Sequence, residues 1–408
     1  MTAPRCRSCG EALEVTVVDL GEQPLANSYL EPSRVDDEQR FPLHARLCVA
    51  CGLVQVDDVV PPEHIFSDYA YFSSYSPSWV EHSRRHAEAS IERLHLGAGD
   101  LVVEVASNDG YLLQWFVAAG VPVLGIEPAA NVAEVARAAG VPTEVAFFGR
   151  ETAIDVRRRH GPARLVVANN VLAHVPDLND FIAGLAVVLA DDGLVTIEFP
   201  HLLNLVRETQ FDTIYHEHFS YFSLLAARGA LGRHGLEVVD VEELATHGGS
   251  LRLHVAHAGT RPVEPAVEAL LERERQAALD RPEGFADFAR RVEACRASLR
   301  ELLDTCRDDG RTVVAYGAAA KGNTLLNHAG VGPDDIAYVV DRNPHKQGLL
   351  LPGSHLEVRD PAEVDRDRPD LLLVLPWNLL AEITEQMAGI RTWGGRFVTA
   401  VPTVVVHP

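Results

Sequence analysis

Short apolar runs, each followed by a stretch with helical periodicity, recur through the middle of the chain. The runs at 101–105, 123–127, 165–168 and 193–197 are rich in Val, Leu and Ile, and each is followed by polar or acidic residues. Runs of this length and composition are typical of buried parallel strands, whose carboxyl ends meet at one edge of a sheet. The pattern predicts a doubly wound α/β domain with its ligand edge at these polar positions.

The last third of the chain repeats this pattern after a different beginning. Residues 264–305 are rich in Ala, Glu and Arg with apolar spacings near 3.6, which predicts one or two long amphipathic helices. Apolar runs then follow at 312–316, 336–340 and 371–375, the first of them before a glycine turn. We therefore expect a second Rossmann-like unit.

With 408 residues, the chain is long enough to bury three cores. We place a small metal-binding module with a tyrosine-rich lid at 1–75 and a cofactor-binding domain at 76–257. The latter should be closed by an antiparallel pair of strands at 235–240 and 250–255. Residues 258–408 form the helical linker and second Rossmann-like domain. The expected fold class is α/β throughout the two larger domains.

Composition and charge narrow the function. Hydrophobic residues make up 47% and charged residues 23%, and no apolar run is long enough to span a bilayer, so we expect a soluble, cytoplasmic protein. The formal net charge of -22 is spread along the chain, which disfavours binding to nucleic acid or to anionic membranes. An anionic ligand would need a local basic pocket. The sequence leaves a monomer and a homodimer equally open.

Four of the six cysteines form two Cys-x-x-Cys-Gly motifs, at Cys6, Cys9, Cys48 and Cys51. Each short turn lets two thiolates face one ion, and four thiolates make a closed tetrahedral zinc site. Apolar runs at 15–18 and 43–47 are placed to form strands that bring the two motifs together. We expect a structural zinc ion, because a closed shell of sulfur leaves no position for catalysis.

A segment rich in aromatic and hydroxyl side chains follows this module, from His64 to Trp79. Such a segment either fills space between domains or forms a lid that presents tyrosine hydroxyls to a substrate. Tyr75 is a candidate substrate-binding residue in the second case.

The turn after the first strand of the central domain indicates the cofactor. Its sequence lacks the GxGxxG dinucleotide motif, since Ala106 and Asn108 stand where glycines would be expected. A closely approaching pyrophosphate is therefore disfavoured, and a nucleoside without phosphates, such as S-adenosylmethionine, fits better. The candidate cofactor-binding residues are Glu104, Ala106, Asn108, Gly110, Tyr111, Glu127, Pro128, Asn169 and Asn170.

Within this set, Glu127 ends the second strand, 23 residues after Glu104. An acidic residue at this tip is placed to accept hydrogen bonds from ribose hydroxyls. Asn169 and Asn170 end a later strand at the same edge, and the loop that follows them carries His174. This histidine either packs in the loop or faces the substrate.

The stretch at 211–222 has the highest density of acid–base chemistry in the chain, with two imidazoles, two carboxylates and two phenols among apolar residues. If it forms a strand, His216 and His218 lie on one face as a plausible metal pair. If it forms a loop, Tyr215, Glu217 and His218 can converge.

Two further groups are candidates for substrate binding. His247 begins a polar turn, His-Gly-Gly, facing the same edge. In the C-terminal unit, Lys321 and Asn323 stand at a helix start after the glycine turn, where a diphosphate could bind. The alternative is that this second fold serves only as a scaffold.

The chain resembles the zinc-containing, S-adenosylmethionine-dependent C-methyltransferases that build branched deoxysugars in antibiotic pathways. The matching motifs run in order along nearly the whole chain: CxxCG twice, EVASNDGYLL, GIEP, YHEHFSYFS, HGG, YGAAAKGNTLLN, DRNPHKQG and LPWN. The resemblance implies that His218 is catalytic, with Glu217 and Tyr215 beside it, and that Tyr71 is a substrate-contacting phenol. It also implies a nucleotide-linked 4-keto deoxysugar, of the dTDP type, methylated at C3.

Methylation of carbon needs a carbanion equivalent, which a ketone next to the target carbon makes accessible. A base removes the proton, an enolate forms, and its carbon attacks the methyl group. We expect His218 to be the base, Glu217 to orient or polarise it, and a tyrosine or a second histidine to bind the enolate oxygen. The alternatives are a sugar O-methyltransferase and a zinc-ribbon ligand-binding protein without turnover.

Overall fold

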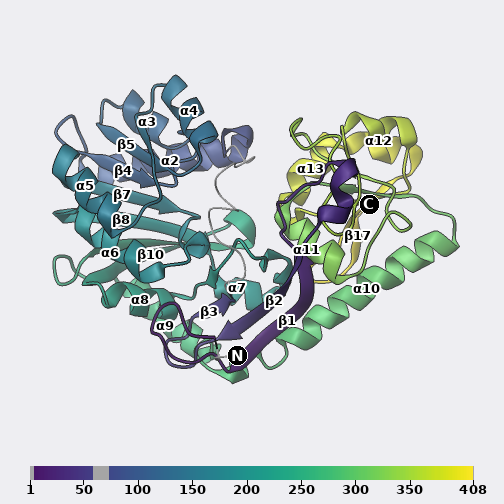
Figure 1. Ribbon diagram of the computed structural model, residues 1–408, viewed down its shortest axis with the longest axis horizontal. Coiled ribbons are helices and arrows are strands. Elements are labelled where there is room, and N and C mark those ends of the chain that lie inside the picture. The colour runs from purple at the N-terminus through teal and green to yellow at the C-terminus, as the bar shows by residue number, and fades with distance from the viewer. Residues whose placement is uncertain (1–3, 58–72, 408) are drawn as a thin grey trace.

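The computed structural model describes residues 4–57 and 73–407, which form three β-sheets with their helices. Figure 1 shows the central sheet and its helices on the left and the C-terminal sheet on the right. The strands of the N-terminal module run between these two bodies at their base. The expected α/β architecture, with a small metal-binding module before two Rossmann-like domains, is confirmed.

The N-terminal module has a four-stranded antiparallel sheet in the order β1-β2-β3-β9. Its strands are β1 (Val15–Pro24), β2 (Arg40–Leu47), β3 (Val54–Val56) and β9 (Ser220–Tyr221). The first two contain the predicted strands at 15–18 and 43–47. The last comes from the stretch at 211–222, so this stretch is built into the metal-binding module.

The central sheet has seven strands in the order β10-β11-β8-β7-β4-β5-β6. They are β4 (Val102–Val105), β5 (Val123–Glu127), β6 (Thr143–Val145), β7 (Ala163–Asn169), β8 (Leu189–Pro200), β10 (Leu236–Leu244) and β11 (Ser250–His257). The first five are parallel, and β10 and β11 close the sheet as an antiparallel pair, as predicted.

Helices cover both faces of this sheet: α2 (Pro77–Leu94), α3 (Leu113–Ala118), α4 (Ala130–Ala138), α5 (Arg150–His160), α6 (Leu178–Val188) and α8 (Leu224–Gly232). Helix α7 (Leu202–Arg207) instead packs in the core that includes β1 and β2. Side chains along β7 alternate between the two faces of the sheet. Leu165 and Val167 pack with α2 and α3, whereas Val166 and Ala168 pack with α5, α6 and α8. The polar residues that end the strands are left at the carboxyl edge.

Two helices, α9 (Pro265–Gln276) and α10 (Phe288–Asp308), lead to the C-terminal domain, and α10 runs along the base of the molecule (Figure 1). The six-stranded sheet has the order β14-β13-β12-β15-β16-β17. Its strands are β12 (Val313–Tyr316), β13 (Val339–Val340), β14 (Val358–Arg359), β15 (Leu371–Val374), β16 (Arg396–Thr399) and β17 (Val405–His407). Its helices are α11 (Ala320–His328), α12 (Ala362–Asp367) and α13 (Leu380–Gln386).

Short 3-10 helices complete the chain: η1 (Pro32–Asp37), η2 (Ser73–Tyr75), η3 (Leu172–His174), η4 (Phe211–Thr213), η5 (Thr246–Gly248), η6 (Pro282–Phe285), η7 (Trp377–Leu379) and η8 (Ala388–Trp393). Within residues 4–57 and 73–407, no helix is both long and apolar enough to cross a lipid bilayer.

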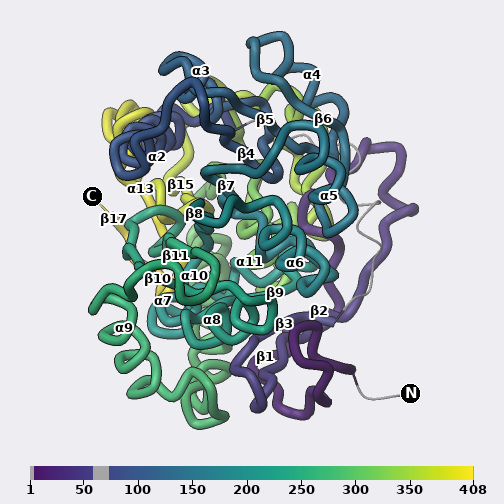
Figure 2. Tube along the Cα trace, turned by 90° about the vertical axis from the view of Figure 1, so that its left-hand side faces the viewer, coloured from purple at the N-terminus to yellow at the C-terminus, as the bar shows by residue number. Residues whose placement is uncertain are grey.

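The modules share a hydrophobic core. One continuous cluster of buried side chains includes residues of β1 and β2, of η4, of α10 and of the C-terminal sheet. Helix α11 packs against both β1 and η4, and Figure 2 shows it in the interior of the molecule, behind the central sheet. The stretch at 211–222 therefore lies where all three modules meet.

Candidate active site

The four predicted zinc ligands, Cys6, Cys9, Cys48 and Cys51, come together as expected. Their sulfur atoms all lie within 4.8 Å of one another, and Cys6 Sγ is 3.6 Å from Cys51 Sγ. Four sulfurs around zinc at roughly 2.3 Å stand about 3.8 Å apart, which agrees with this arrangement. In the described part of the chain, no other group of metal-binding side chains comes this close.

The backbone of both motifs is alike. Gly10 N donates to Cys6 O and Gly52 N to Cys48 O, each at 2.8 Å, and both glycines have φ between +73° and +81°. Glycine is needed there because other residues adopt this conformation at a cost. The Gln55 amide donates to Cys6 Sγ at 3.3 Å, which orients that ligand from outside the cluster.

The turn after β4, at residues 106–110, is called the cofactor turn below. It has a glycine-like backbone although two of its left-handed residues are not glycine. Ala106, Asn108 and Gly110 have φ of 55°, 49° and 82°, and Asn170 on the neighbouring strand end has 51°. Left-handed conformations in non-glycine residues persist only when the surroundings hold them, and they cluster at functional sites. Ala106 and Asn108 stand where a dinucleotide motif would have glycines, and their contact with the cofactor stays a prediction.

Glu127 lies at the predicted tip of β5, buried. Its two carboxylate oxygens each accept one backbone N–H, Oε2 from Asn108 at 3.0 Å and Oε1 from Ala129 at 2.9 Å. These bonds fix the carboxylate and leave each oxygen a further lone pair for a ribose hydroxyl. Burial raises its pKa above the ordinary value. Pro128 follows at the same edge.

Unpaired polar atoms line this carboxyl edge of β4 and β7. One oxygen of Asp109, the amide of Asn169 and Oδ1 of Asn170 are buried and have no hydrogen-bond partner among the described residues. Buried polar groups are normally paired, so these atoms fit a polar ligand such as S-adenosylmethionine. Burial also raises the pKa of Glu104 well above its ordinary value, while contact with the hydroxyl of Tyr111 lowers it.

The stretch at 211–222 forms turns over most of its length and not one continuous strand. It comprises η4, a turn and the two residues of β9, so the reading of His216 and His218 as a metal pair on one strand face is wrong. His216 Nε2 instead donates to the Pro42 carbonyl at 3.2 Å. The alternative was a loop in which Tyr215, Glu217 and His218 converge, and it holds for Tyr215 and His218 only.

Tyr215 and His218 form that pair. The Tyr215 hydroxyl lies 2.8 Å from His218 Nε2, and the two rings lie 4.0 Å apart between centroids at 30°. His218 Nδ1 lies 2.9 Å from the Thr213 carbonyl, which can only accept, so Nδ1 carries the proton and the Nε2 lone pair accepts from the Tyr215 hydroxyl. Burial lowers the pKa of His218 well below 6.5, so the ring is neutral at pH 7.

Glu217 has a different role from the one expected. Its carboxylate does not reach His218 but accepts hydrogen bonds from the backbone and side chain of Asn27, at 3.1 and 3.3 Å. The Thr213 carbonyl orients His218 in its place. The turn sends consecutive side chains in different directions, so Glu217 ties the site to the N-terminal module.

His174 and His247 lie close to this pair. The His174 ring is 4.6 Å from that of His218, and its Nδ1 donates to the Glu217 carbonyl at 2.7 Å. His247 has φ of 55°, and its ring meets the edge of Trp79 at 5.1 Å. Burial lowers the pKa of both histidines to about 4.

Lys321 reaches this site from the start of α11. Its Nζ donates to Asn378 Oδ1 at 2.8 Å and lies 4.8 Å from the centre of the Trp377 ring. Trp377 Nε1 in turn donates to Asp212 Oδ2 at 2.7 Å. Burial lowers the pKa of Lys321, and the charge of Asp212 partly restores it. Asp212 was not among the predicted residues.

The remaining predicted substrate residues lie apart. Asn323 is buried, and its amide donates to the Ala26 carbonyl at 2.6 Å, which joins the C-terminal domain to the N-terminal module. Tyr75 is 55% exposed next to the start of α2. Tyr71 lies outside the described residues.

A buried ion-pair network beside the site was also missed. His82 Nε2 lies 2.9 Å from Glu198 Oε2, and Arg252 binds the same oxygen at 2.9 Å. The His82 ring stacks on Trp79 at 4.9 Å. The carboxylate after an apolar strand was a signal for Glu198, but nothing in the sequence linked it to His82.

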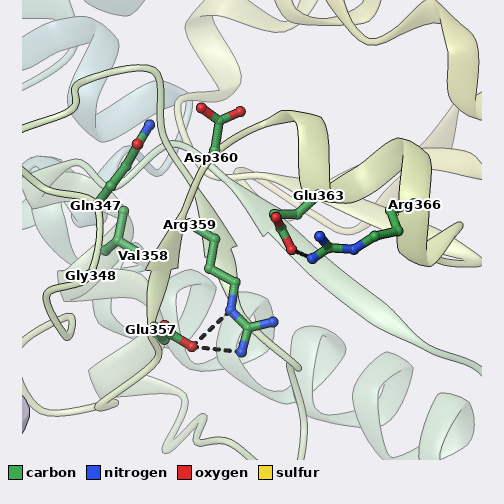
Figure 3. Close-up of a pocket in the computed structure, with 8 residues that line it drawn as sticks. All are labelled: Gln347, Gly348, Glu357, Val358, Arg359, Asp360, Glu363 and Arg366. Carbon is green, nitrogen blue, oxygen red and sulfur yellow. Dashed lines mark hydrogen bonds and ion pairs between the residues drawn. The ribbon is translucent and has the colours of Figure 1, made fainter.

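A separate open pocket of about 410 Å³ lies on the outer edge of the C-terminal sheet (Figure 3). Arg359 in it pairs with Glu357, and Arg366 pairs with Glu363. Its two arginines are thus neutralised by neighbours, and it is distant in sequence from every candidate catalytic residue.

Three family models match the chain in succession. Residues 6–66 match a zinc binding domain, residues 79–241 a methyltransferase domain, and residues 245–402 a C-methyltransferase C-terminal domain. These matches follow the order of the three modules, and they support a zinc-binding module and S-adenosylmethionine as methyl donor.

Solved structures resemble part of the chain. They include magnesium protoporphyrin IX methyltransferase (ChlM) from Synechocystis PCC 6803 with bound SAM, with 14% identity, a TM-score of 0.36 and coverage of 50% of this chain and all of that one. The CcbJ methyltransferase from Streptomyces caelestis has 14% identity and a TM-score of 0.34, covering 42% of this chain and 89% of that one.

The C-methyltransferase NovU of Streptomyces niveus is 39% identical to the chain over 399 residues, which cover 97% of this chain and 95% of that protein. The chain therefore belongs to the C-methyltransferase family that joins a zinc-binding module, a methyltransferase domain and a C-methyltransferase C-terminal domain.

Proposed function

We propose that the enzyme methylates a carbon next to the ketone of a nucleotide-linked 4-keto deoxysugar, at C3 of a dTDP-type sugar, through an enolate. The observation that carries this proposal is the Tyr215–His218 pair, with a neutral imidazole whose Nε2 lone pair is fixed by the bond from Nδ1 to Thr213. The antibiotic-pathway substrate class comes from the motif resemblance, and the carbon acceptor from the family.

The spacing of the pair suits an O=C–C–H unit. The Tyr215 oxygen and His218 Nε2 lie 2.8 Å apart, so one can face the carbonyl oxygen while the other faces the hydrogen on the next carbon. His218 Nε2 takes the proton, and the C–H electron pair moves to form the C=C bond as the carbonyl oxygen gains negative charge. Tyr215 O–H then donates to this oxygen.

S-adenosylmethionine, when bound, supplies an electrophilic methyl group. The residues that would hold it are those at the carboxyl edge of β4, β5 and β7, with Glu127 on the ribose hydroxyls. His218 is half-buried among buried neighbours, which would limit the access of water and so the reprotonation of the enolate before its carbon attacks.

The C-terminal domain is proposed to hold the nucleotide end of the substrate. Lys321 stands at the second position of α11, where the helix amino terminus adds its dipole to the lysine charge. In a chain with a net charge of -22, this local cation would attract a diphosphate into the same site that contains His218. Asn323 would act indirectly, by fixing the helix start against Ala26.

Hydrogen exchange separates this proposal from sugar O-methylation, which needs no C–H cleavage. Candidate 4-keto nucleotide sugars are incubated with enzyme in deuterated water without methyl donor, and loss of the ring proton next to the ketone is followed by NMR. Wild type should exchange this proton. His218→Asn should lose exchange by about a hundred- to ten-thousand-fold, as is typical for a lost general base.

Two comparisons make the result specific. Tyr215→Phe should slow exchange while leaving His218 in place, and His160→Asn, at an exposed histidine paired with Glu144, should leave it unchanged. Methyl transfer by wild type without any exchange at carbon, or exchange in His218→Asn at the wild-type rate, would contradict the proposed base.

A further inference from the structure

The cofactor turn is hydrogen-bonded to the segment that precedes α2. Ser73 N donates to Asn108 Oδ1 at 2.9 Å, and Ser74 N donates to Asp109 Oδ2 at 3.1 Å. Both acceptors are side chains of the turn after β4, and both donors are backbone amides of η2. The position of Tyr75, the next residue, therefore depends on the cofactor turn.

The same segment contacts the turn a second time through α2. Trp79 in the first turn of this helix stacks on Tyr111 at 6.1 Å and 29°. Its other contacts lie on the substrate side, with His247 at 5.1 Å and with His82, which binds Glu198. Residues 73–82 thus join the cofactor turn at one end to the proposed substrate residues at the other.

Asn108 connects the two halves of this arrangement. Its backbone N–H binds Glu127 Oε2, the carboxylate proposed for the ribose, and its side chain binds Ser73. It holds a left-handed φ of 49°, which the surrounding bonds must maintain. A ligand that engages Glu127 therefore acts on the residue that holds the 73–82 segment.

We propose that Asn108 and Asp109 are positioning residues that couple methyl-donor binding to the substrate segment at residues 73–82. Occupancy of the cofactor turn restricts Asn108 and Asp109 and strengthens their bonds to Ser73 and Ser74. Trp79 is then held more firmly against His247 and His82 when the methyl donor is present. This coupling is thermodynamic, so substrate binding in turn favours the methyl donor.

The proposal predicts a change in amide exchange that needs no sugar. In hydrogen–deuterium exchange with residue-level fragmentation, saturating S-adenosylhomocysteine should slow the Ser73 and Ser74 amides of wild type. Asn108→Gly keeps the left-handed backbone and the N–H to Glu127 but removes the acceptor. Its Ser73 amide should exchange about two- to tenfold faster than in wild type with the ligand bound, the effect of one lost hydrogen bond.

Asp100→Ala is the matched control, because it removes a side-chain acceptor from a backbone amide, that of Gly97, outside the cofactor turn. It should keep ligand-dependent slowing at Ser73. Calorimetry confirms saturation for each variant, and if Asn108→Gly cannot be saturated, Asp109→Ala with Ser74 as the readout decides. Equal slowing in wild type and in the acceptor-less variant, or no slowing in saturated wild type, overturns the proposal.

The inference rests on methyl-donor binding at this turn and not on the identity of the sugar. Absence of carbon-bound proton exchange would refute the enolate mechanism and leave the amide result intact. A kinetic arm adds the functional consequence: Asn108→Gly should raise KM for the nucleotide sugar at saturating methyl donor, which a role confined to holding the cofactor would not do.

Discussion

Gly248 provides a quantitative test of how the C-terminal domain meets the catalytic turn. It follows His247 with φ of +88°, and a Cβ added there would lie 2.4 Å from Trp377 Cη2 and 2.9 Å from Gln210 Nε2. The change to alanine therefore combines a strained backbone with a collision against a side chain of another domain.

The two costs are separable. A left-handed alanine costs about 1–2 kcal/mol, and overpacking a tight site costs about 1–3 kcal/mol, so Gly248→Ala should lower the free energy of unfolding by roughly 2–5 kcal/mol. Gly235→Ala is the matched control. Its φ is +75° and nothing lies within 4 Å of the added Cβ, so it carries the backbone cost alone.

The functional consequence follows from the contacts of Trp377. Its indole N–H binds Asp212, and Lys321 lies over its ring, so displacing Trp377 disturbs the cation proposed for the diphosphate. Urea unfolding and steady-state kinetics of both variants measure the outcome. We expect a raised KM for the nucleotide sugar in Gly248→Ala only. If the two variants lose the same free energy of unfolding, Trp377 does not pack on this turn and the reasoning fails.

The remaining predictions address zinc, cofactor, substrate and pH. Removing zinc with a chelator should unfold the N-terminal module, seen by circular dichroism; an unchanged spectrum argues against a structural ion. Glu127→Gln should weaken S-adenosylhomocysteine binding about ten- to a hundredfold by calorimetry, unless ribose binds elsewhere. Lys321→Met should raise KM for the nucleotide sugar and leave the affinity for S-adenosylhomocysteine unchanged. Because burial lowers the pKa of His218, its neutral form persists below pH 6.5. The value of kcat should therefore fall only when the pH drops below 6.5. A fall in kcat that begins above pH 6.5 would contradict His218 as the base.

The sequence was sufficient for the elements that carry periodic or covalent signals. The parallel strands, the closing antiparallel pair and the zinc ligands follow from apolar runs and fixed cysteine spacing. Strand β9 could not be predicted, because two residues, Ser220 and Tyr221, show no periodicity and pair with β3 far away in sequence. The interpretation of the stretch as a possible strand failed for the same reason.

Proximity in sequence also misled the reading of one catalytic neighbour. Glu217 adjoins His218, yet its carboxylate binds Asn27, 190 positions away. Conversely, Ala106 and Asn108, which stand where glycines would be expected, do have left-handed φ values. The place of this turn after an apolar strand was visible in the sequence, whereas side-chain partners depend on how the modules pack.

Burial shifts the pKa values of the groups in this site, and the composition of the chain could not predict these shifts. Although the chain is strongly acidic, burial raises the pKa of Asp212 to about 6 and raises that of Glu217, and it lowers the pKa values of His218 and Lys321. Each group is thereby shifted toward its neutral form. In the proposed mechanism, a negative enolate forming there would meet less repulsion from carboxylates, and the hydrogen bond from Tyr215 would be stronger in a medium with little water. His218 would be a weak base in such a place, so the bond from Tyr215 to the developing oxyanion would have to provide much of the driving force for removing the proton.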